Sequence, residues 1–478
     1  LMESKGINTP LELPDLDETY DLTLLKLVQR LNDIGGLETI ELFFSTHGYL
    51  VSKHIPGTVG IKYIEGLNKL WKPKWSREAR GRFYWIGLGP ESDPVKPTNP
   101  INQVIELKSA LERGIEVLTL AHIESGIEQT QDVEPQSLSV LDDKQKLIIK
   151  ALGTTNNPIN TVLTAKVDGS LIIINFYPHN CPQYPIIKNL ILNYANNFTK
   201  SLCAYCVDNN LPIITISTQG TLFIGVDMED YFLTAIQSLV STPTKFVSDW
   251  DLIIPEFVGL CMEYYSELEL NQNLMCNMCF EAFCANRTTI TGKLHTELAV
   301  GYDHNGFNLL GMMYNARYIP HFDMPKKIFK HPIHIKIQSS DQVFELMKKL
   351  DKTVLGELSL NDFIAGTNCQ LDNLTSNVIH PEGFVMLTPD SSNTYDYAKI
   401  KTQLYYRCHK VKPCNIKNLL LLPESCQVYY PVLKSIHLFF DDFENKLKEL
   451  IVKSLHALTL EINPNSELYQ MQNIKGKS

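Results

Sequence analysis

Along the chain, the spacing of apolar positions changes between the period of helices and the alternation of strands. Residues 21–34 place leucine and valine side chains at i, i+3 and i+4 intervals, which predicts an amphipathic helix. Residues 39–64 contain short β-rich runs separated by glycines, which predicts strands and turns. A proline-rich loop is expected at 90–100, a helix at 101–116 and an exposed acidic connection at 124–140.

The pattern is sharper after residue 160 and mixes strands with helices. Strands are predicted at 161–176, 213–226, 274–283, 308–314, 383–387 and 397–406, the first two broken by turns at Asp168-Gly169 and Gly220. Helices are predicted at 186–209, at 341–350 and in a tail from 430 to 460. Because the strands do not alternate strictly with helices, the pattern indicates an α+β fold with an antiparallel core.

Composition narrows the class of protein. The chain of 478 residues has ordinary globular composition and no apolar run of about eighteen residues, so no transmembrane helix is expected. A net charge of −10 argues against binding to nucleic acid by bulk charge, although a local basic groove is compatible with it. Eleven cysteines without an apolar secretion signal favour reduced thiols in a cytoplasmic compartment.

Two cysteine pairs raise the question of a zinc site. They are Cys203 with Cys206 and Cys276 with Cys279. Four thiolates could hold zinc, but the gap between the pairs is far longer than that of common zinc ribbons. Cys276 and Cys279 are also three apart on a predicted strand, so they point to opposite faces. The pattern favours buried core cysteines over zinc ligands.

The segment Lys166-Val167-Asp168-Gly169-Ser170 is the first candidate for chemistry. A lysine at the end of an apolar strand, before a turn glycine, can present its amine to a pocket. The amine is nucleophilic only when deprotonated, so such a site must lower its pKa by desolvation or by nearby cations or metal. The alternative is a polar hairpin tip, because a lone Lys-x-Asp-Gly is common.

Acids and lysines downstream strengthen the functional interpretation. Glu281 and Glu382 each stand on or beside an apolar strand, where an unpaired carboxylate is costly, so each needs a hydroxyl, a cation or a metal. Lys399 and Lys401 are two apart on a strand and therefore project to the same face. Two ammonium groups side by side repel each other unless an anion sits between them, and a phosphate suits that position.

In this order, the residues resemble the covalent nucleotidyltransferase superfamily of ATP-dependent ligases and mRNA capping enzymes. The likeness is greatest to RNA ligases of the phage RNA ligase 1 type. The similar segments are Arg77–Gly81, Lys166–Leu171 (motif I), Ser217–Thr221, Phe280-Glu281 with Asn286-Arg287 (motif III), Leu309–Arg317, Glu382–Val385 (motif IV) and Lys399–Thr402 (motif V). The intervals from Arg80 to Lys166 and from Glu281 to Glu382 are longer than usual in the family, and Ser170 in place of arginine disfavours a DNA ligase.

The resemblance implies a fold and a division of the chain. The fold would be a nucleotidyltransferase (ATP-grasp-like ligase) core of antiparallel sheets flanked by helices. Residues 1–150 would form an N-terminal region with an Arg-Gly strand element of the core and an insertion. Residues 151–413 would carry motifs I to V, and residues 414–478 would form a helical C-terminal region.

The resemblance also implies roles for single residues. Lys166 would attack the α-phosphate of ATP. The other positions are Arg80 on the β- and γ-phosphates, Glu281 on the ribose, Lys399 and Lys401 on the α-phosphate, and Glu382 with Asp168 on Mg²⁺ or Mn²⁺. Hard oxygen ligands and phosphates suit these metals.

The expected function is an ATP-dependent RNA ligase that joins 5′-phosphate and 3′-hydroxyl ends through lysyl-AMP and RNA-adenylate, in RNA (tRNA) repair or splicing. The alternatives are an mRNA guanylyltransferase that forms lysyl-GMP, and a non-catalytic RNA-binding module. Residues 398–423 lack Asp and Glu and mix basic with aromatic residues, which is typical of RNA contact. An edge strand protected by lysines would show the same composition.

Overall fold

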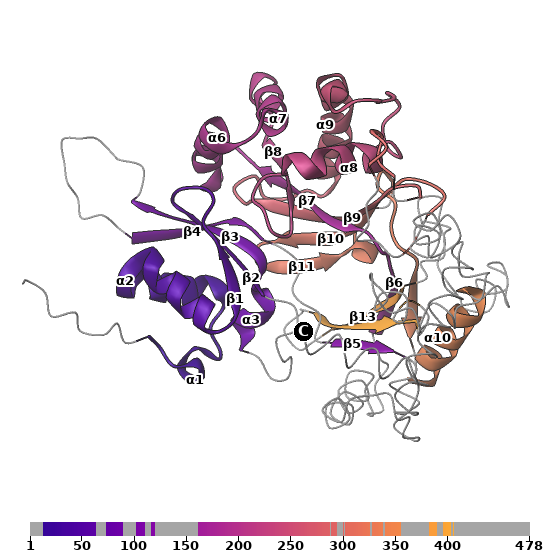
Figure 1. Ribbon diagram of the computed structural model, residues 1–478, viewed down its shortest axis with the longest axis horizontal. Helices are drawn as coiled ribbons and strands as arrows, with labels where there is room; N and C mark the ends of the chain where they lie inside the picture. Colours follow the sequence, from indigo (N-terminus) through magenta and orange to yellow (C-terminus); the bar gives the residue numbers. More distant parts are fainter. Residues whose placement is uncertain are drawn as a thin grey trace, which may run out of the picture.

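The computed structural model describes residues 13–63, 73–88, 102–109, 116–119, 161–286, 288–293, 300, 302–325, 327–337, 340–354, 382–389, 395–402 and 405. These residues form helices and three mainly antiparallel sheets, which confirms the α+β class (Figure 1). None of the helices in this part of the chain combines the length and the hydropathy that a bilayer span requires. The predicted connection at 124–140 and the C-terminal region 414–478 lie outside the described residues.

The first sheet is a four-stranded unit with helix α2 (Leu24–Thr46) packed on one face. Its strands, in sheet order, are β1 (Tyr49–Ser52), β2 (Thr58–Tyr63), β3 (Arg80–Leu88) and β4 (Asn102–Lys108). The short helices α1 (Leu16–Thr19) and α3 (Lys74–Glu78) flank this unit. Its core is aromatic, since the rings of Phe43 and Phe44 lie edge-on to Trp75 with centroids 5.8 and 5.6 Å away.

Two predictions in this unit are wrong. Residues 39–46 are helical, because α2 resumes after a kink at Gly35 and Gly36, where Gly36 has a φ of 68°. The segment 101–116 contains strand β4 in place of a helix. Val104 packs towards α2, whereas Ile105 and Leu107 pack on the opposite face, so pairing with β3 decides its conformation.

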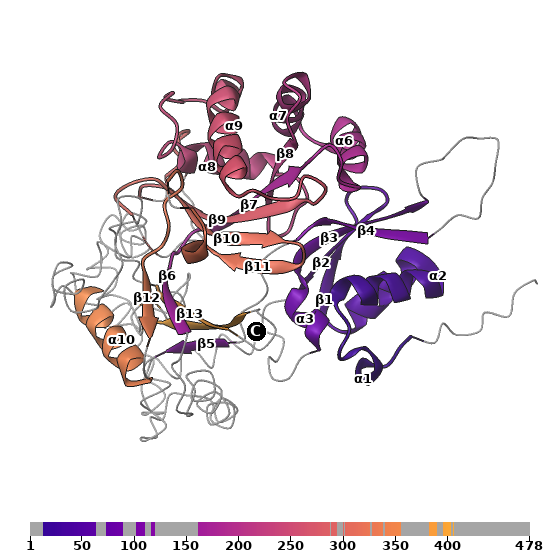
Figure 2. The ribbon, with the colours of Figure 1, turned by 180° about the vertical axis from the view of Figure 1, so that it is seen from behind.

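The second sheet lies under four helices (Figure 2). Its order is β11 (Arg317–Pro320), β10 (Gly306–Tyr314), β9 (Cys276–Phe283), β7 (Ser170–Tyr177) and β8 (Ile213–Thr218). The helices are α6 (Gln183–Tyr194), α7 (Asn197–Asp208), α8 (Val226–Ile236) and α9 (Trp250–Glu267), and the 3₁₀ turns η1 (Val247–Asp249) and η2 (His321–Asp323) follow α8 and β11. The predicted helix 186–209 is therefore two helices, and the second strand expected within 213–226 is absent from these described residues.

The third sheet carries the predicted nucleophile. Its order is β12 (His334–Ile337), β6 (Thr161–Lys166), β13 (Gly383–Pro389), β14 (Tyr395–Lys401) and β5 (Glu116–Thr119), with helix α10 (Ser340–Val354) following β12. Strands β6 and β7 do not pair with each other, because β6 joins β12 and β13 while β7 joins β8 and β9. The hairpin-tip interpretation of Lys166–Ser170 is therefore wrong, and the segment instead links two sheets.

The boundary expected at residue 150 lies outside the described residues. Strand β3, which was expected to belong to the ligase core, lies in the separate N-terminal sheet. Strand β5, from the same N-terminal region, instead pairs in parallel with β14 of the third sheet.

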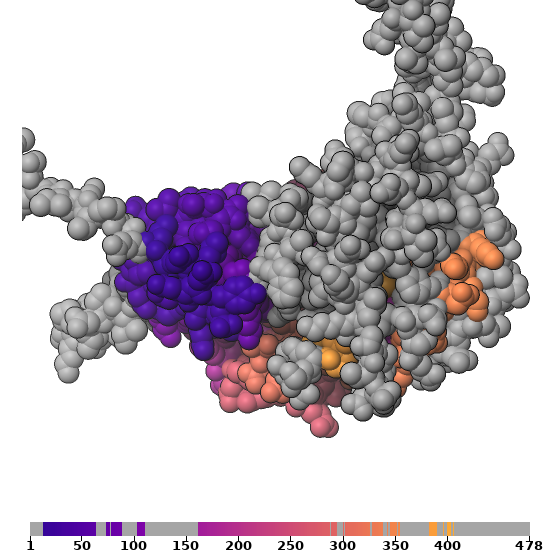
Figure 3. Space-filling view, turned by 90° about the horizontal axis from the view of Figure 1, so that it is seen from below, coloured from indigo at the N-terminus to yellow at the C-terminus, as the bar shows by residue number. Residues whose placement is uncertain are grey.

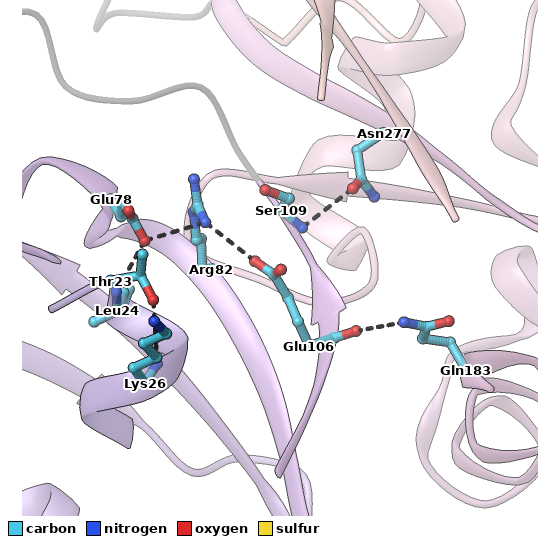
Figure 4. Close-up of polar contacts among 9 residues, drawn as sticks. All are labelled: Thr23, Leu24, Lys26, Glu78, Arg82, Glu106, Ser109, Gln183 and Asn277. Atoms are coloured by element: carbon cyan, nitrogen blue, oxygen red, sulfur yellow. Dashed lines mark hydrogen bonds and ion pairs between the residues drawn. The ribbon is translucent and has the colours of Figure 1, made fainter. Parts of the chain in front are cut away.

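Strand β4 fastens the N-terminal sheet to the second sheet. The backbone N–H of Ser109 donates to Asn277 Oδ1 at 3.3 Å, and Gln183 Nε2 donates to the carbonyl of Glu106 at 3.1 Å (Figure 4). Lys108, which is fully buried, donates from Nζ to the carbonyls of Thr218 and Thr221 at 2.7 Å each. These contacts fix the position of the neighbouring strand β3 relative to the second sheet.

Candidate active site

The three lysines of the candidate site share one face of the third sheet. In the register, Lys166 on β6 lies opposite Gly383 on β13, which lies opposite Lys401 on β14. Two register positions further along, Val385 lies opposite Lys399. Residues opposite each other, and residues two apart on a strand, point to the same face. The sheet therefore brings together side chains that are more than two hundred positions apart in sequence.

Glu382 joins two of these lysines. Its Oε2 lies 2.7 Å from Lys166 Nζ, and its Oε1 lies 3.0 Å from Lys401 Nζ. Burial alone would raise the pKa of Glu382, but the two ammonium groups outweigh burial and lower the pKa below its ordinary value. The effect on Lys166 is reciprocal: burial lowers its pKa, but Glu382 and then Glu281 raise it more, so the net shift is upward. In this state Lys166 is held as an ammonium ion.

Two glycines allow the close approach of strands at this site. A Cβ on Gly383, where φ is +134°, would lie 2.0 Å from the carbonyl oxygen of Ile400. A Cβ on Gly169 would lie 2.3 Å from the carbonyl oxygen of Ala282. Any side chain at either position would push the strands apart. Steric crowding therefore explains why glycine occupies these positions in the Lys166–Leu171 and Glu382–Val385 segments.

Asp168 orders the crossing between the two sheets. One carboxylate oxygen accepts a hydrogen bond from the backbone N–H of Val300 at 2.8 Å, and the other accepts one from the hydroxyl of Tyr405 at 2.9 Å. The backbone N–H of Asp168 donates to Tyr302 Oη at 3.0 Å. Burial, followed by the charge of Glu382, raises the pKa of Asp168. In this state both carboxylate oxygens of Asp168 accept hydrogen bonds from the protein. The assignment of Asp168 as a metal ligand stays a prediction.

A β-bulge positions Arg80. Ile61 pairs with Arg82 and the next residue, Lys62, pairs with Arg80, so Gly81 is an extra residue in β3. Gly81 has a φ of +88°, and a Cβ there would lie 1.7 Å from the carbonyl oxygen of Gln219. Bulges of this kind bend a strand and re-aim its side chains. The bulge at Gly81 therefore directs the side chain of Arg80 towards the second and third sheets.

Four of the predicted residues line one cavity. It has a volume of about 250 Å³, and its walls include Arg80, Lys166, Glu281 and Lys399 from all three sheets. Glu382 contacts both Lys166 and Lys401, and Asp168 lies in the adjoining crossing.

The pKa values of two lining groups are shifted in opposite directions. Burial, opposed by Lys166, raises the pKa of Glu281 to about 7. Burial, reinforced by the charges of Arg80 and Lys166, lowers the pKa of Lys399 well below its ordinary value. Crowded cations beside a cavity lower one another's pKa, and a bound anion reverses that effect. The arrangement can therefore hold a polyanion and can stabilise charge that develops on it.

The cavity is also lined by residues to which the sequence assigned no role. Tyr318, His321 and Gln219 line it from the ends of strands and from a turn. Tyr318 Oη donates to the carbonyl of Leu310 at 2.8 Å, which fixes its ring beside the cavity. Tyr318 and His321 belong to no recognised motif and are placed here by the pairing of β10 with β11, whereas Gln219 follows β8 in the Ser217–Thr221 segment.

The carboxylates fit a cation that arrives with phosphates. Among the residues described by the structure, no group of three or more His, Cys, Asp or Glu side chains could hold a metal by itself. Mg²⁺ is commonly bound by one or two carboxylates together with substrate phosphates and waters. Glu382, with both oxygens facing the site's cations, is a suitable carboxylate donor for such an ion.

The cysteine pairs belong to the core. All four side chains are buried and free of disulfides. Cys276 packs in the cluster beneath the helices, whereas Cys279 packs on the other face of β9, as the alternation predicts. The preference for core cysteines is confirmed for these residues.

The predicted RNA-contact segment is described only at its start. Residues 398–402 lie on or just after β14, and Tyr405 is buried against Asp168. The remainder of 398–423 lies outside the described residues.

No family model matches the sequence, and no curated protein matches it either. The interpretation of the site therefore depends on its own geometry and on the order of its motifs.

Proposed function

We propose that the protein is an ATP-dependent RNA ligase that joins 5′-phosphate and 3′-hydroxyl RNA ends, as RNA repair or splicing requires. The observation that carries the proposal is the convergence of Arg80, Lys166, Glu281 and Lys399 on one cavity of about 250 Å³. Separate stretches of sequence supply a nucleophile, a group for the ribose and cations for phosphates. Such a combination is needed to form a lysyl-nucleotide.

In the first step, Lys166 Nζ bonds to the α-phosphorus of ATP while the bond to the β-phosphate oxygen breaks and pyrophosphate leaves. Lys399 and Lys401 hold the α-phosphate, and Arg80 holds the departing β- and γ-phosphates. Glu281 accepts hydrogen bonds from the ribose hydroxyls. The negative charge of the nucleotide offsets the repulsion among the cations and restores the pKa of Lys399 towards its ordinary value.

Lys166 must lose a proton before it attacks, and Glu382 controls this requirement. The contact of 2.7 Å with Glu382 keeps Lys166 protonated in the state described. Glu382 and the phosphates would hold Mg²⁺ or Mn²⁺, and such an ion would supply positive charge beside Glu382. The proton then passes to solvent, and the free amine faces the phosphorus.

The second and third steps transfer AMP and seal the RNA. An oxygen of the RNA 5′-phosphate attacks the phosphorus of lysyl-AMP, the Nζ–P bond breaks, and Lys166 recovers a proton. The 3′-hydroxyl of the other RNA end then attacks the 5′-phosphorus of the RNA-adenylate, its proton passes to solvent, and AMP leaves. One ATP is therefore converted to AMP and pyrophosphate for each phosphodiester bond formed.

A sealing assay tests the proposal. An internally ³²P-labelled RNA with a 5′-phosphate and a 3′-hydroxyl end is incubated with protein, Mg²⁺ and either ATP or GTP, and the products are separated on a denaturing gel. A parallel incubation with [α-³²P]ATP or [α-³²P]GTP and no RNA detects the covalent protein adduct. We expect RNA-adenylate and sealed RNA with ATP, and neither product from the same RNA with a 5′-hydroxyl end. Formation of a lysyl-GMP adduct with GTP, without RNA sealing, would instead support the guanylyltransferase. Absence of both nucleotide transfer and sealing would contradict the proposal.

A further inference from the structure

A second cavity, of about 290 Å³, lies on the face of the N-terminal sheet away from helix α2. Seen from below, this sheet and its helix gather at one end of the molecule (Figure 3). Gly81 and Gly220 line this cavity, whereas their chain neighbours Arg80 and Gln219 line the candidate active site. The two cavities therefore lie on either side of one contact between strand β3 and the turn after β8.

The second cavity is basic where it approaches the active site. Its lining includes Lys62 and His54 and contains no Asp or Glu. Lys62 lies opposite Leu50 on one side and opposite Arg80 on the other. Leu50, which is 54% exposed, Lys62 and Arg80 therefore form one row of side chains across the sheet. Arg80, at the end of this row, also lines the candidate active site. Side-by-side cations favour an anionic ligand.

The geometry of phosphoryl transfer selects one RNA strand as that ligand. Attacking and leaving groups lie roughly in line at the phosphorus. Pyrophosphate leaves from the side opposite Lys166, so the RNA 5′-phosphate must later approach from that same side. This is the side of Arg80 if the proposed function holds. The strand that carries the 5′-phosphate consequently enters past Arg80, where the second cavity begins.

We propose that the second cavity binds the 5′-phosphate RNA strand next to its reactive end. Lys62 contacts a backbone phosphate, and the apolar residues Leu50 and Phe83 of the lining contact the adjoining nucleotide. A positive groove with an apolar surface suits single-stranded RNA without demanding a sequence. The inference rests on the proposed function and adds the path of one substrate strand.

The test uses RNA that is already adenylylated at its 5′ end, in the full-length protein. Lys62→Glu should raise the KM for this RNA by about ten-fold or more, because a charge-assisted contact becomes repulsive. The slope of log KM against log salt should become shallower by about 0.7, as expected for one lost phosphate contact on a single strand. The matched control is Lys53→Glu, which makes the same change at an exposed residue paired with Glu41 and outside the cavity. This control should change KM less than two-fold.

A second variant guards against misfolding of the first. Ser52→Trp places a large ring in the cavity from strand β1 and should raise the KM for the same RNA without altering the salt slope. Wild-type KM values in both Lys62→Glu and Ser52→Trp would overturn the inference, as would an equal effect of Lys53→Glu. Failure of the wild-type protein to form lysyl-AMP would refute the proposed function, whereas normal lysyl-AMP formation with unaffected RNA binding would refute the cavity alone.

Discussion

Arg80 and Arg82 lie two residues apart on strand β3, yet they belong to two different kinds of buried charge network. Arg82 Nη1 lies 3.4 Å from Glu78 Oε2 and 3.4 Å from Glu106 Oε1, between the two acids (Figure 4). Glu78 also accepts a hydrogen bond from the backbone N–H of Leu24 at 2.9 Å. This network ties α2, α3, β3 and β4 together, and none of its three charged side chains lines either cavity described above.

The network beyond Arg80 is built differently. Its cations, Arg80, Lys166, Lys399 and Lys401, crowd around Glu382 and a cavity. Burial raises the pKa of Glu106 in the first network, whereas cations lower the pKa of Glu382 in the second. A buried ion pair alone, such as those of Arg82, therefore indicates a role in holding the fold together. A functional site is indicated by cations that are crowded, shifted in pKa and open to a cavity.

The largest expected effect is that of Lys166→Ala. It should abolish covalent labelling by ATP, because the proposed mechanism assigns the attacking amine to Lys166. Stability should change little, since Glu382 keeps Lys401 as a partner at 3.0 Å. Labelling with [α-³²P]ATP and urea unfolding measure the two quantities, with Lys53→Ala as the control. Retention of an acid-stable AMP adduct would remove Lys166 from this role.

Arg82→Met should act on stability and not on nucleotide chemistry. It leaves two buried carboxylates without their cation, which should lower the free energy of unfolding by about 3–5 kcal/mol. The loss should be smaller at pH 5 than at pH 8, because Glu106, whose pKa is raised by burial, can then protonate. Urea unfolding at both pH values checks this. Unchanged stability with lost labelling would place Arg82 in the active site and would contradict its structural role.

Arg80→Met is the matched variant on the same strand. Losing one charge-assisted phosphate contact of about 1.5–3 kcal/mol should slow lysyl-AMP formation roughly ten- to a hundred-fold. Sealing of pre-adenylylated RNA should change much less, because pyrophosphate has already left. Single-turnover rates of the two reactions provide the comparison, and Lys399→Met should slow both. Equal damage to both rates in Arg80→Met would mean that Arg80 serves the fold or the RNA.

The smallest effect concerns Glu281 and pH. Its pKa of about 7 in the folded protein exceeds the ordinary value of 4.5, so the folded state binds this proton more tightly than the unfolded state. The stabilisation is complete below about pH 4.5 and is lost as pH rises through 7, for a total of at most about 3 kcal/mol. Glu281→Gln should remove this slope. Urea unfolding of the nucleotide-free protein from pH 5 to 8 measures it, and identical slopes in both proteins would contradict the assignment.

Sequence patterns located much of the candidate site but little of the architecture around it. Strands ending at Lys166, containing Glu281 and following Glu382 were predictable, because apolar runs with turn glycines mark them. The bulge at Gly81 was not, since it depends on pairing with β2 and on the carbonyl of Gln219. The helical residues 39–46 and strand β4 were missed for the same reason: tertiary packing decided their conformation.

The residue that becomes covalently attached to AMP decides whether Lys166 is the nucleophile. The protein is incubated with ATP and Mg²⁺, digested, and its peptides are analysed by mass spectrometry for attached AMP. We expect AMP on Lys166, within the peptide that contains Val167-Asp168-Gly169, and no adduct at Lys399 or Lys401. No adduct with ATP, or an adduct on any other residue, would contradict it.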